Sequence, residues 1–209
     1  MPRPKNTEER RLQIVQGLIQ VMAQRGYDGA SVAQVAAAAK LSPGLVHYHF
    51  KSKGEILLGA LEHLVKAHEA RVEEALEGAG SDAQARLNAF IDAHLALGPG
   101  ADRNALACWI LFSGEALRSA AVQAPFEQAL ERQRQVLESI LDEGARSGAF
   151  RCGDRRAAAV ALVASIQGYF VLAGSAPSLI PQGTAARSVR AMAVGLLSAG
   201  GEEESDGPS

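Results

Sequence analysis

Residues 31–53 carry the side chains of this chain that are best suited to contact a nucleic acid. On a helix over 43–51, at about 100° per residue, the small and polar positions face one way: Pro43, Gly44, His47, Tyr48 and Lys51. The mostly apolar positions face the other way: Leu45, Val46, His49 and Phe50. A histidine ring can pair with a base edge, and hydroxyl and ammonium groups bind phosphate oxygens. Glycine lets the backbone approach closely. The pattern predicts a helix that lies in the major groove of DNA.

A second short helix precedes this one and completes a known DNA-binding arrangement. Ser31 and Gln34 form a capping-box pattern that predicts a helix over about 32–39. Ser42 caps the next helix with Pro43 at its first position. Two helices with so short a turn predict a helix-turn-helix, whose capping serines are also phosphate sites. The predicted DNA contacts are Ser31, Gln34, Ser42, Pro43, Gly44, His47, Tyr48, Lys51 and Lys53.

Each of these residues also has a plainer interpretation. A serine-capped helix pair followed by a lysine occurs in many α-helical proteins, and spacing alone does not separate the two. His49 differs from its neighbours, because its angle places it on the buried side of the helix. We therefore expect His49 to be a core histidine and not a base contact.

The charge of the chain is unevenly distributed. The net charge is −2, which by itself argues against a nucleic-acid-binding protein. Residues 1–53, however, hold eight Lys/Arg and three acidic residues, and the rest of the chain holds 13 basic and 20 acidic residues. This asymmetry predicts a basic DNA-binding head on an acidic body.

No pattern for catalysis or metal binding stands out. The two cysteines, Cys108 and Cys152, lie far apart without a His/Cys cluster, so no zinc site or cofactor is expected. Cys108 falls in an apolar helix and is predicted to be a small core residue. No serine–histidine–acid set, glycine-rich phosphate loop or carboxylate pair has a convincing spacing. We do not expect an enzyme.

The periodicity along the chain predicts an all-α protein of about nine helices. We expect a basic arm over 1–6, helices over 7–25, 32–39, 43–51, 53–76, 81–97, 103–119, 125–147, 155–173 and 184–199, and a disordered acidic tail over 200–209. The predicted domains are a helix-turn-helix domain (1–52) and a body (53–199).

Residues 157–186 carry no charge and are long enough to raise the question of a membrane span. We favour a buried helix, because Ser165, Gln167, Gly168 and many alanines interrupt the apolar run. The first residues do not have the pattern of a signal peptide, so we expect a cytoplasmic protein.

The helix-turn-helix resembles the DNA-binding domain of the tetracycline-repressor (TetR) family. The run Ser31–Ala36, the run Leu41–Lys53 and the helix with Ile14, Leu18, Met22 and Gly26-Tyr27 carry the resemblance, over about residues 9–65. Two positions depart from it. Lys40 stands where glycine is usual and is predicted to adopt a left-handed or distorted conformation, and His47 stands where an aromatic residue is common. The stretch WILFSGEALRS resembles, more weakly, the subgroup of the betaine-pathway repressor.

The resemblance implies a function and a set of partners. It implies a repressor that binds a palindromic operator in double-stranded DNA as a homodimer, paired through the helices at 155–173 and 184–199. Small residues at 157, 158, 161, 164, 168 and 195 would allow close packing there. It further implies release by an unknown small-molecule effector bound in the body. An effector-independent architectural DNA-binding protein is the alternative.

The candidate effector contacts are Phe90, His94, Trp109, Phe112, Glu115 and Tyr169. Trp109, Phe112 and Glu115 are spaced three apart and form one ridge of a helix, which suggests a ring that stacks on a ligand beside a carboxylate that faces a cation. The alternative is that these aromatic residues belong to the core. Glu115 then pairs with Arg118 on the surface.

Overall fold

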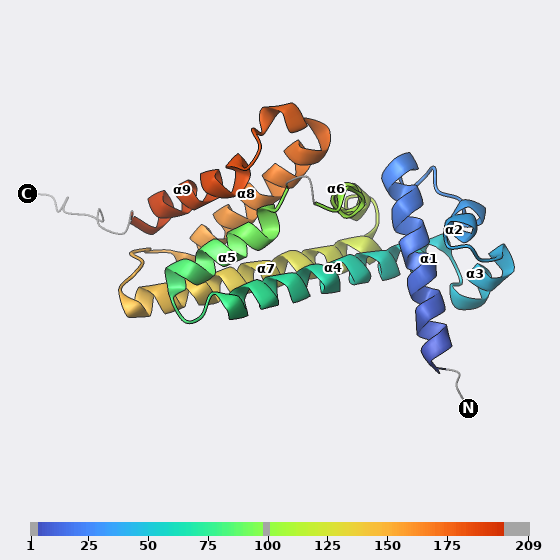
Figure 1. The fold of residues 1–209 in the computed structure, drawn as a ribbon, viewed down its shortest axis with the longest axis horizontal. Coiled ribbons are helices and arrows are strands. Elements are labelled where there is room, and N and C mark those ends of the chain that lie inside the picture. The colour runs from blue at the N-terminus through green and yellow to red at the C-terminus, as the bar shows by residue number, and fades with distance from the viewer. Residues whose placement is uncertain (1–3, 98–100, 199–209) are drawn as a thin grey trace, which may run out of the picture. The chain divides into compact units, whose positions relative to one another are not determined.

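The computed structural model describes residues 4–97 and 101–198, and within these ranges it is all α-helical, as predicted (Figure 1). The helices are α1 (Pro4–Arg25), α2 (Val32–Ala38), α3 (Pro43–His49), α4 (Lys53–Gly78), α5 (Ala83–Leu95), α6 (Arg103–Ala116), α7 (Ala120–Ser147), α8 (Arg155–Ser175) and α9 (Thr184–Ser198), with a 3-10 turn η1 (Pro177–Leu179). The predicted acidic tail over 200–209 lies outside the described residues.

Two compact units make up the chain. One comprises residues 1–68 and 102–127, and the other 69–101 and 128–209. The predicted division between residues 52 and 53 differs from this packing, because α6 packs against α1 and the first part of α4 belongs to the same unit. Long-range packing of this kind leaves no local mark in the sequence. The predicted functional division into a head and a body stays a prediction.

The first unit is built around α1. Ile14, Leu18 and Met22 have no exposed surface, which confirms the apolar face predicted for this helix. Gly17 lets α2 approach closely, since a Cβ there would lie 2.8 Å from the carbonyl oxygen of Val35. Gly26 has a φ of +71° and ends the helix, as predicted.

Three helix starts differ from the predictions. Helix α1 begins at Pro4, so part of the expected basic arm is helical and Glu8 and Glu9 lie beyond the first turn. Helix α5 begins at Ala83 and not at residue 81, because Asp82 caps it: the Asp82 carboxylate accepts a hydrogen bond of 2.7 Å from the Ala85 amide. Helix α7 begins at Ala120, which leaves Pro125 inside the helix.

The position of Pro125 has a physical reason. Proline removes one intrahelical hydrogen bond and normally favours the first turn. Here Val122, three residues before it, and Phe126, directly after it, bury their side chains. Burial of two apolar side chains, at about 1.5–3 kcal/mol each, is large enough to offset the roughly 3 kcal/mol that a proline inside a helix costs.

The second unit is held together by α5, α8 and α9, which pack on one another (Figure 1). Its buried residues include Leu87, Ile91, Leu162, Ile166 and Val189. After α7 the chain turns back tightly, because the ring of Phe150 lies directly on Gly144. A Cβ at Gly144 would be 1.9 Å from the Phe150 ring. Glycine is therefore required there by close packing.

Helix α8 is long and apolar enough to cross a membrane, but core helices pass the same test. Its inward face is buried and consists of Ala158, Ala159, Leu162, Ile166 and Phe170. A different face stays exposed and includes Val160, Val171 and Leu172. The inward face fits the predicted body helix that packs on its own unit.

Candidate nucleic-acid interface

The caps of α2 and the turn after it are formed as the sequence predicts. The Ser31 hydroxyl accepts a 3.2 Å hydrogen bond from the Gln34 amide, and the Gln34 side-chain oxygen accepts one of 2.8 Å from the Ser31 amide. This is the predicted capping box. Lys40 has a φ of +56° and adopts the left-handed conformation, the first of the two alternatives predicted for it. The chain is thereby reversed within a few residues and α3 follows at once.

Helix α3 ends at His49, two residues before the predicted end, because Phe50 is in an extended conformation; its two faces are separated as predicted. The Ser42 hydroxyl accepts a 3.2 Å hydrogen bond from the Leu45 amide, with Pro43 at the first helical position. Val46 and Phe50 are 1% and 2% exposed. On the opposite face Tyr48 is 80% exposed. The other exposed positions are Pro43, Gly44, His47 and Lys51. A buried apolar side thus fixes which side chains point to solvent.

Two further positions on α3 bear on recognition. His49 is half-buried, in line with its expected place on the inner side, and its ring meets that of Tyr48 edge-on at 5.1 Å. A Cβ added at Gly44 would meet no atom within 4 Å. No packing inside the protein therefore requires a glycine at this position, and the free space is available to a bound backbone or base.

The ammonium of Lys53, which is predicted to contact a phosphate, already has partners within the protein. Its ammonium donates a 2.9 Å hydrogen bond to the Tyr27 carbonyl and lies 4.2 Å above the Tyr27 ring. Burial, together with the charges of Glu115 and Asp28, raises the pKa of the Tyr27 phenol. Lys53 therefore anchors the start of α4 to the end of α1. A phosphate contact by Lys53 stays a prediction, and would use the remaining N–H groups of its ammonium.

One charged residue of the first unit was not singled out by sequence reasoning. Arg11, on α1, contacts the end of α3 through the carbonyl of His49 and the ring of Phe50, and it contacts the first turn of α4 through the carboxylate of Glu55. The nearest of these partners is 38 residues away along the chain. No spacing rule connects residues so far apart, so only the tertiary structure reveals this cluster.

The effector candidates of the first unit are largely engaged with neighbours. Phe112 has no exposed surface, and the ring of Trp109 lies 4.8 Å from that of Phe126. Glu115 forms an ion pair with Arg118, which was the alternative interpretation of that carboxylate. Effector binding by these residues stays a prediction, and it requires Glu115 to exchange one cationic partner for another.

The effector candidates of the second unit include two core residues. Phe90 is 1% exposed and its ring lies 4.2 Å from that of His94. The His94 Nδ1 donates a 2.8 Å hydrogen bond to the Phe90 carbonyl, and burial lowers the pKa of His94 to about 4. The imidazole is neutral near neutral pH. Tyr169, on α8, is half-buried and keeps some surface for a ligand.

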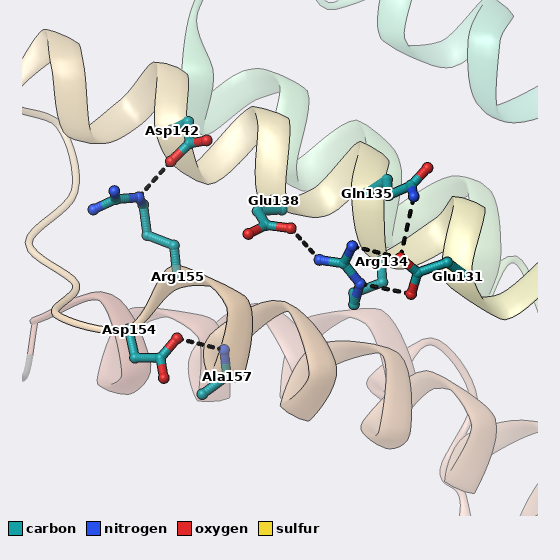
Figure 2. Close-up of polar contacts among 8 residues, drawn as sticks. All are labelled: Glu131, Arg134, Gln135, Glu138, Asp142, Asp154, Arg155 and Ala157. Carbon is teal, nitrogen blue, oxygen red and sulfur yellow. Dashed lines mark hydrogen bonds and ion pairs between the residues drawn. The ribbon is translucent and has the colours of Figure 1, made fainter.

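The second unit also contains a row of ion pairs along α7 (Figure 2). Arg134, 8% exposed, binds the carboxylates of Glu131 and Glu138 on its own helix. Hydrogen bonds from Arg134 hold the pKa of Glu131 at about 2. Further along, Arg155 of α8 pairs with Asp142 (Figure 2). Arg134 faces two carboxylates of its own helix, so these pairs stabilise α7, whereas the pair between Arg155 and Asp142 links α8 to α7.

Cys108 is a buried core residue, as the sequence predicts. Cys108 has no exposed surface, and burial raises the pKa of its thiol to about 12. Its Sγ lies 3.4 Å from the Ile19 carbonyl. The predicted core role of Cys108 is confirmed. Among the residues that the structure describes, no group of three His, Cys, Asp or Glu side chains could hold a metal ion.

Comparison with characterised families covers most of the chain. Residues 14–60 match the model of bacterial regulatory proteins of the tetR family, and residues 83–198 match the C-terminal model of BetI-type transcriptional repressors. The chain is 33% identical over 75 residues to the HTH-type transcriptional regulator HbdR of Aromatoleum sp. (strain CIB), covering 36% of this chain and 33% of HbdR. It is 28% identical over 119 residues to the HTH-type transcriptional regulator BetI of Brucella canis, covering 57% of this chain and 59% of BetI. The chain thus spans a third to somewhat over half of the length of these relatives.

A solved structure extends the likeness over both units. A transcriptional regulator from Saccharomonospora viridis, crystallised in complex with choline, is similar with a TM-score of 0.76 and 26% identity, over 90% of this chain and 95% of that one. The members of this family are transcriptional regulators and not enzymes. The helix-turn-helix match at one end and the repressor-type match over more than half of the chain agree, and the protein belongs to the tetR family of regulatory proteins, with a BetI-type C-terminal region.

Proposed function

We propose that this protein is a transcriptional repressor that binds a palindromic DNA operator as a homodimer and releases it when a small molecule binds the body. The observation that carries the proposal is the exposed face of α3. Tyr48 and His47 extend into solvent from a helix whose other side is buried and whose start is capped. Such a regulator meets its DNA in the cytoplasm.

The side chains of the interface divide into two roles. Tyr48, Lys51 and the capping serines suit phosphate oxygens, which fix the position of the helix on the duplex. His47 suits a base edge in the major groove, where the four base pairs differ in their donors and acceptors. Phosphate contacts also make the affinity fall steeply with salt concentration.

A homodimer through α8 and α9 is supported by what these helices leave uncovered. Six large apolar side chains on them are 36–58% exposed: Val160, Val171, Leu172, Met192, Val194 and Leu196. Gly168 and Gly195 have open space where a Cβ would stand. Ala158 is an exception among the small residues expected there, since it is 4% exposed and packs within its own unit. A second copy would bury the exposed set and pair two reading helices with two half-sites.

Choline is the first effector to test. The Saccharomonospora viridis regulator is similar over both units and binds choline in its crystal. Aromatic rings beside a carboxylate recognise quaternary ammonium groups. Trp109 and Glu115 offer this combination on one helix. If Glu115→Ala left every effector response unchanged, the proposed contact between Glu115 and a cationic effector would be wrong.

The test of the proposed function starts with DNA. Purified full-length protein is mixed with random duplex DNA at near-physiological salt, and the bound fragments are sequenced. A palindrome supports a sequence-specific dimer, and release of that palindrome by choline or by a related cation supports the effector-linked repressor. Salt-sensitive binding without sequence preference would instead support the alternative, an architectural DNA-binding protein.

A further inference from the structure

The last residue of α3 and the two residues that follow it are held by contacts from outside the helix. The carbonyl of His49 accepts a hydrogen bond from Arg11 Nη1. The ring of Phe50 lies under the Arg11 guanidinium, whose central carbon is 4.0 Å from the ring centroid. The amide of Lys51 donates a 2.8 Å hydrogen bond to Glu55 Oε2. The other carboxylate oxygen, Glu55 Oε1, lies 3.6 Å from Arg11 Nη2 and closes the cluster.

Helix α3 needs this external support. It has seven residues, and a helix of two turns is not stable by itself in water. The last carbonyl groups of a helix have no donor within it. Arg11 supplies a donor to the carbonyl of His49 and places a positive charge at the negative end of the helix dipole.

The geometry of the cluster bears directly on the exposed residues of α3. His47 and Tyr48 immediately precede the held segment 49–51. A rotation of α3 about its axis would move both side chains, because adjacent residues on a helix share its orientation. Arg11 meets a carbonyl, a ring and a carboxylate at once, which requires the planar fork of a guanidinium.

We propose that Arg11 is a positioning residue for DNA recognition: together with Glu55 it fixes the orientation of α3, and thereby the sequence preference of the protein, without contacting DNA itself. The inference rests on the proposed function, in which α3 reads the operator. It adds Arg11, a residue of α1, to the determinants of specificity. In this proposal the Arg11 guanidinium binds a backbone carbonyl of the protein and not a phosphate of the DNA.

The test compares two neighbouring arginines. Arg11→Met and Arg10→Met remove the same charge from the same helix, but Arg10 donates a 2.9 Å hydrogen bond to Gln13 on its own helix. Affinities are measured for the best duplex recovered from the random pool and for a scrambled duplex, over a range of salt concentrations. We expect Arg11→Met to lower the ratio of the two affinities by about tenfold, the size of losing one base contact. Arg10→Met should leave the ratio unchanged.

The salt dependence separates positioning from direct contact. A positioning residue leaves the slope of log affinity against log salt unchanged. A direct phosphate contact would lower the slope by about 1 and weaken both duplexes equally. That second pattern, or equal ratios in the two variants, would overturn the proposal.

A measurement without DNA keeps the inference separate from the proposed function. Hydrogen exchange of the Lys51 amide in the free protein should be faster in Arg11→Met and Glu55→Gln than in Arg10→Met, whether or not an operator is found. Unchanged exchange in Arg11→Met and Glu55→Gln would show that the cluster does not hold the end of α3, and a wild-type protein without sequence preference would contradict the proposed function.

If Arg11→Met does not fold, Arg11→Lys is the alternative variant, because it keeps the charge and the aliphatic stem but loses the planar fork of the guanidinium. It should show a smaller loss of the same ratio.

Discussion

The exposed face of α3 and the aromatic residues of α5 are both candidate binding sites, but they differ in how much of their side-chain surface is exposed to solvent. Tyr48 on α3 is 80% exposed, whereas Phe90 on α5 is 1% exposed and its neighbour His94 is 4% exposed. A site that reads a large polymer needs side chains outside the fold. A site for a small molecule lies among residues that also form the core, so exposure identifies the first kind and not the second.

The substitution with the largest expected effect is Gly144→Ala, in the second unit. The added methyl would lie 1.9 Å from the Phe150 ring, which must leave its buried position. We expect the free energy of unfolding to fall by about 3 kcal/mol, the upper range for overpacking. Denaturant unfolding measures it.

Gly114→Ala is the matched control, since Gly114 is also helical and has no atom within 4 Å of its would-be Cβ. It should raise stability by about 0.5–1 kcal/mol through helix propensity. Equal effects of the two substitutions would show that the contact between Gly144 and Phe150 does not constrain this unit.

The next largest effect is the pH dependence from His94. Its pKa is lowered from 6.5 to about 4 by burial, so below pH 6.5 the unfolded chain takes up a proton that the folded protein does not. The stability present above pH 6.5 is therefore lost as the pH falls toward 4, by about 3 kcal/mol in total. His94→Phe should remove this component of the pH dependence.

Urea unfolding at a series of pH values tests this expectation. Phe90→Leu is a useful control, because it alters the packing around the ring but keeps the group that titrates. It should lower stability at every pH and keep the slope. A wild-type slope retained in His94→Phe would assign the pH dependence to other groups.

Helix α3 shows how far the sequence predicts structure when the signals are local. The caps at Ser31 and Ser42, the left-handed Lys40 and the two faces of α3 all depend on residues within a few positions of one another. Sequence reasoning predicts them correctly. Most other helices are also anticipated, with differences of a few residues at their starts and ends.

Other features of the structure depend on contacts between residues far apart in the chain. Arg11 at the end of α3, Phe150 on Gly144 and the packing of α6 with α1 have no local signal, so the sequence does not reveal them. The same holds for the predicted effector residues. Helical spacing gives an aromatic ridge, but it does not distinguish a ligand contact from a core residue such as Phe112.

His47→Ala tests whether the exposed face of α3 reads sequence. Loss of one base contact should cost about 1–3 kcal/mol on the preferred duplex and little on sequences changed at that base pair. Repeating the selection with the variant measures it directly, as a relaxed preference at one position of each half-site. An unchanged motif would remove His47 from the reading residues.

Tyr48→Phe should have a smaller and more uniform effect. If its hydroxyl binds a phosphate, the loss is about 1 kcal/mol of binding free energy on every duplex. Folding should be unaffected, since the side chain is 80% exposed. If Tyr48→Phe and His47→Ala changed binding in the same way, the division between positioning and reading side chains would be wrong.

The smallest effect we predict is a gain, and it concerns the turn that separates α2 from α3. Lys40 has a φ of +56°, a conformation that costs a residue with a Cβ about 1–2 kcal/mol relative to glycine. Glycine also has more freedom to lose on folding, so Lys40→Gly should raise the free energy of unfolding by up to about 1 kcal/mol. Ala39→Gly, one residue earlier at a φ of −75°, should instead lower it. Thermal unfolding of the two variants decides the matter: if both glycines destabilise equally, the lysine relieves its strain through a contact of its own, and the turn is not a source of strain in the recognition unit.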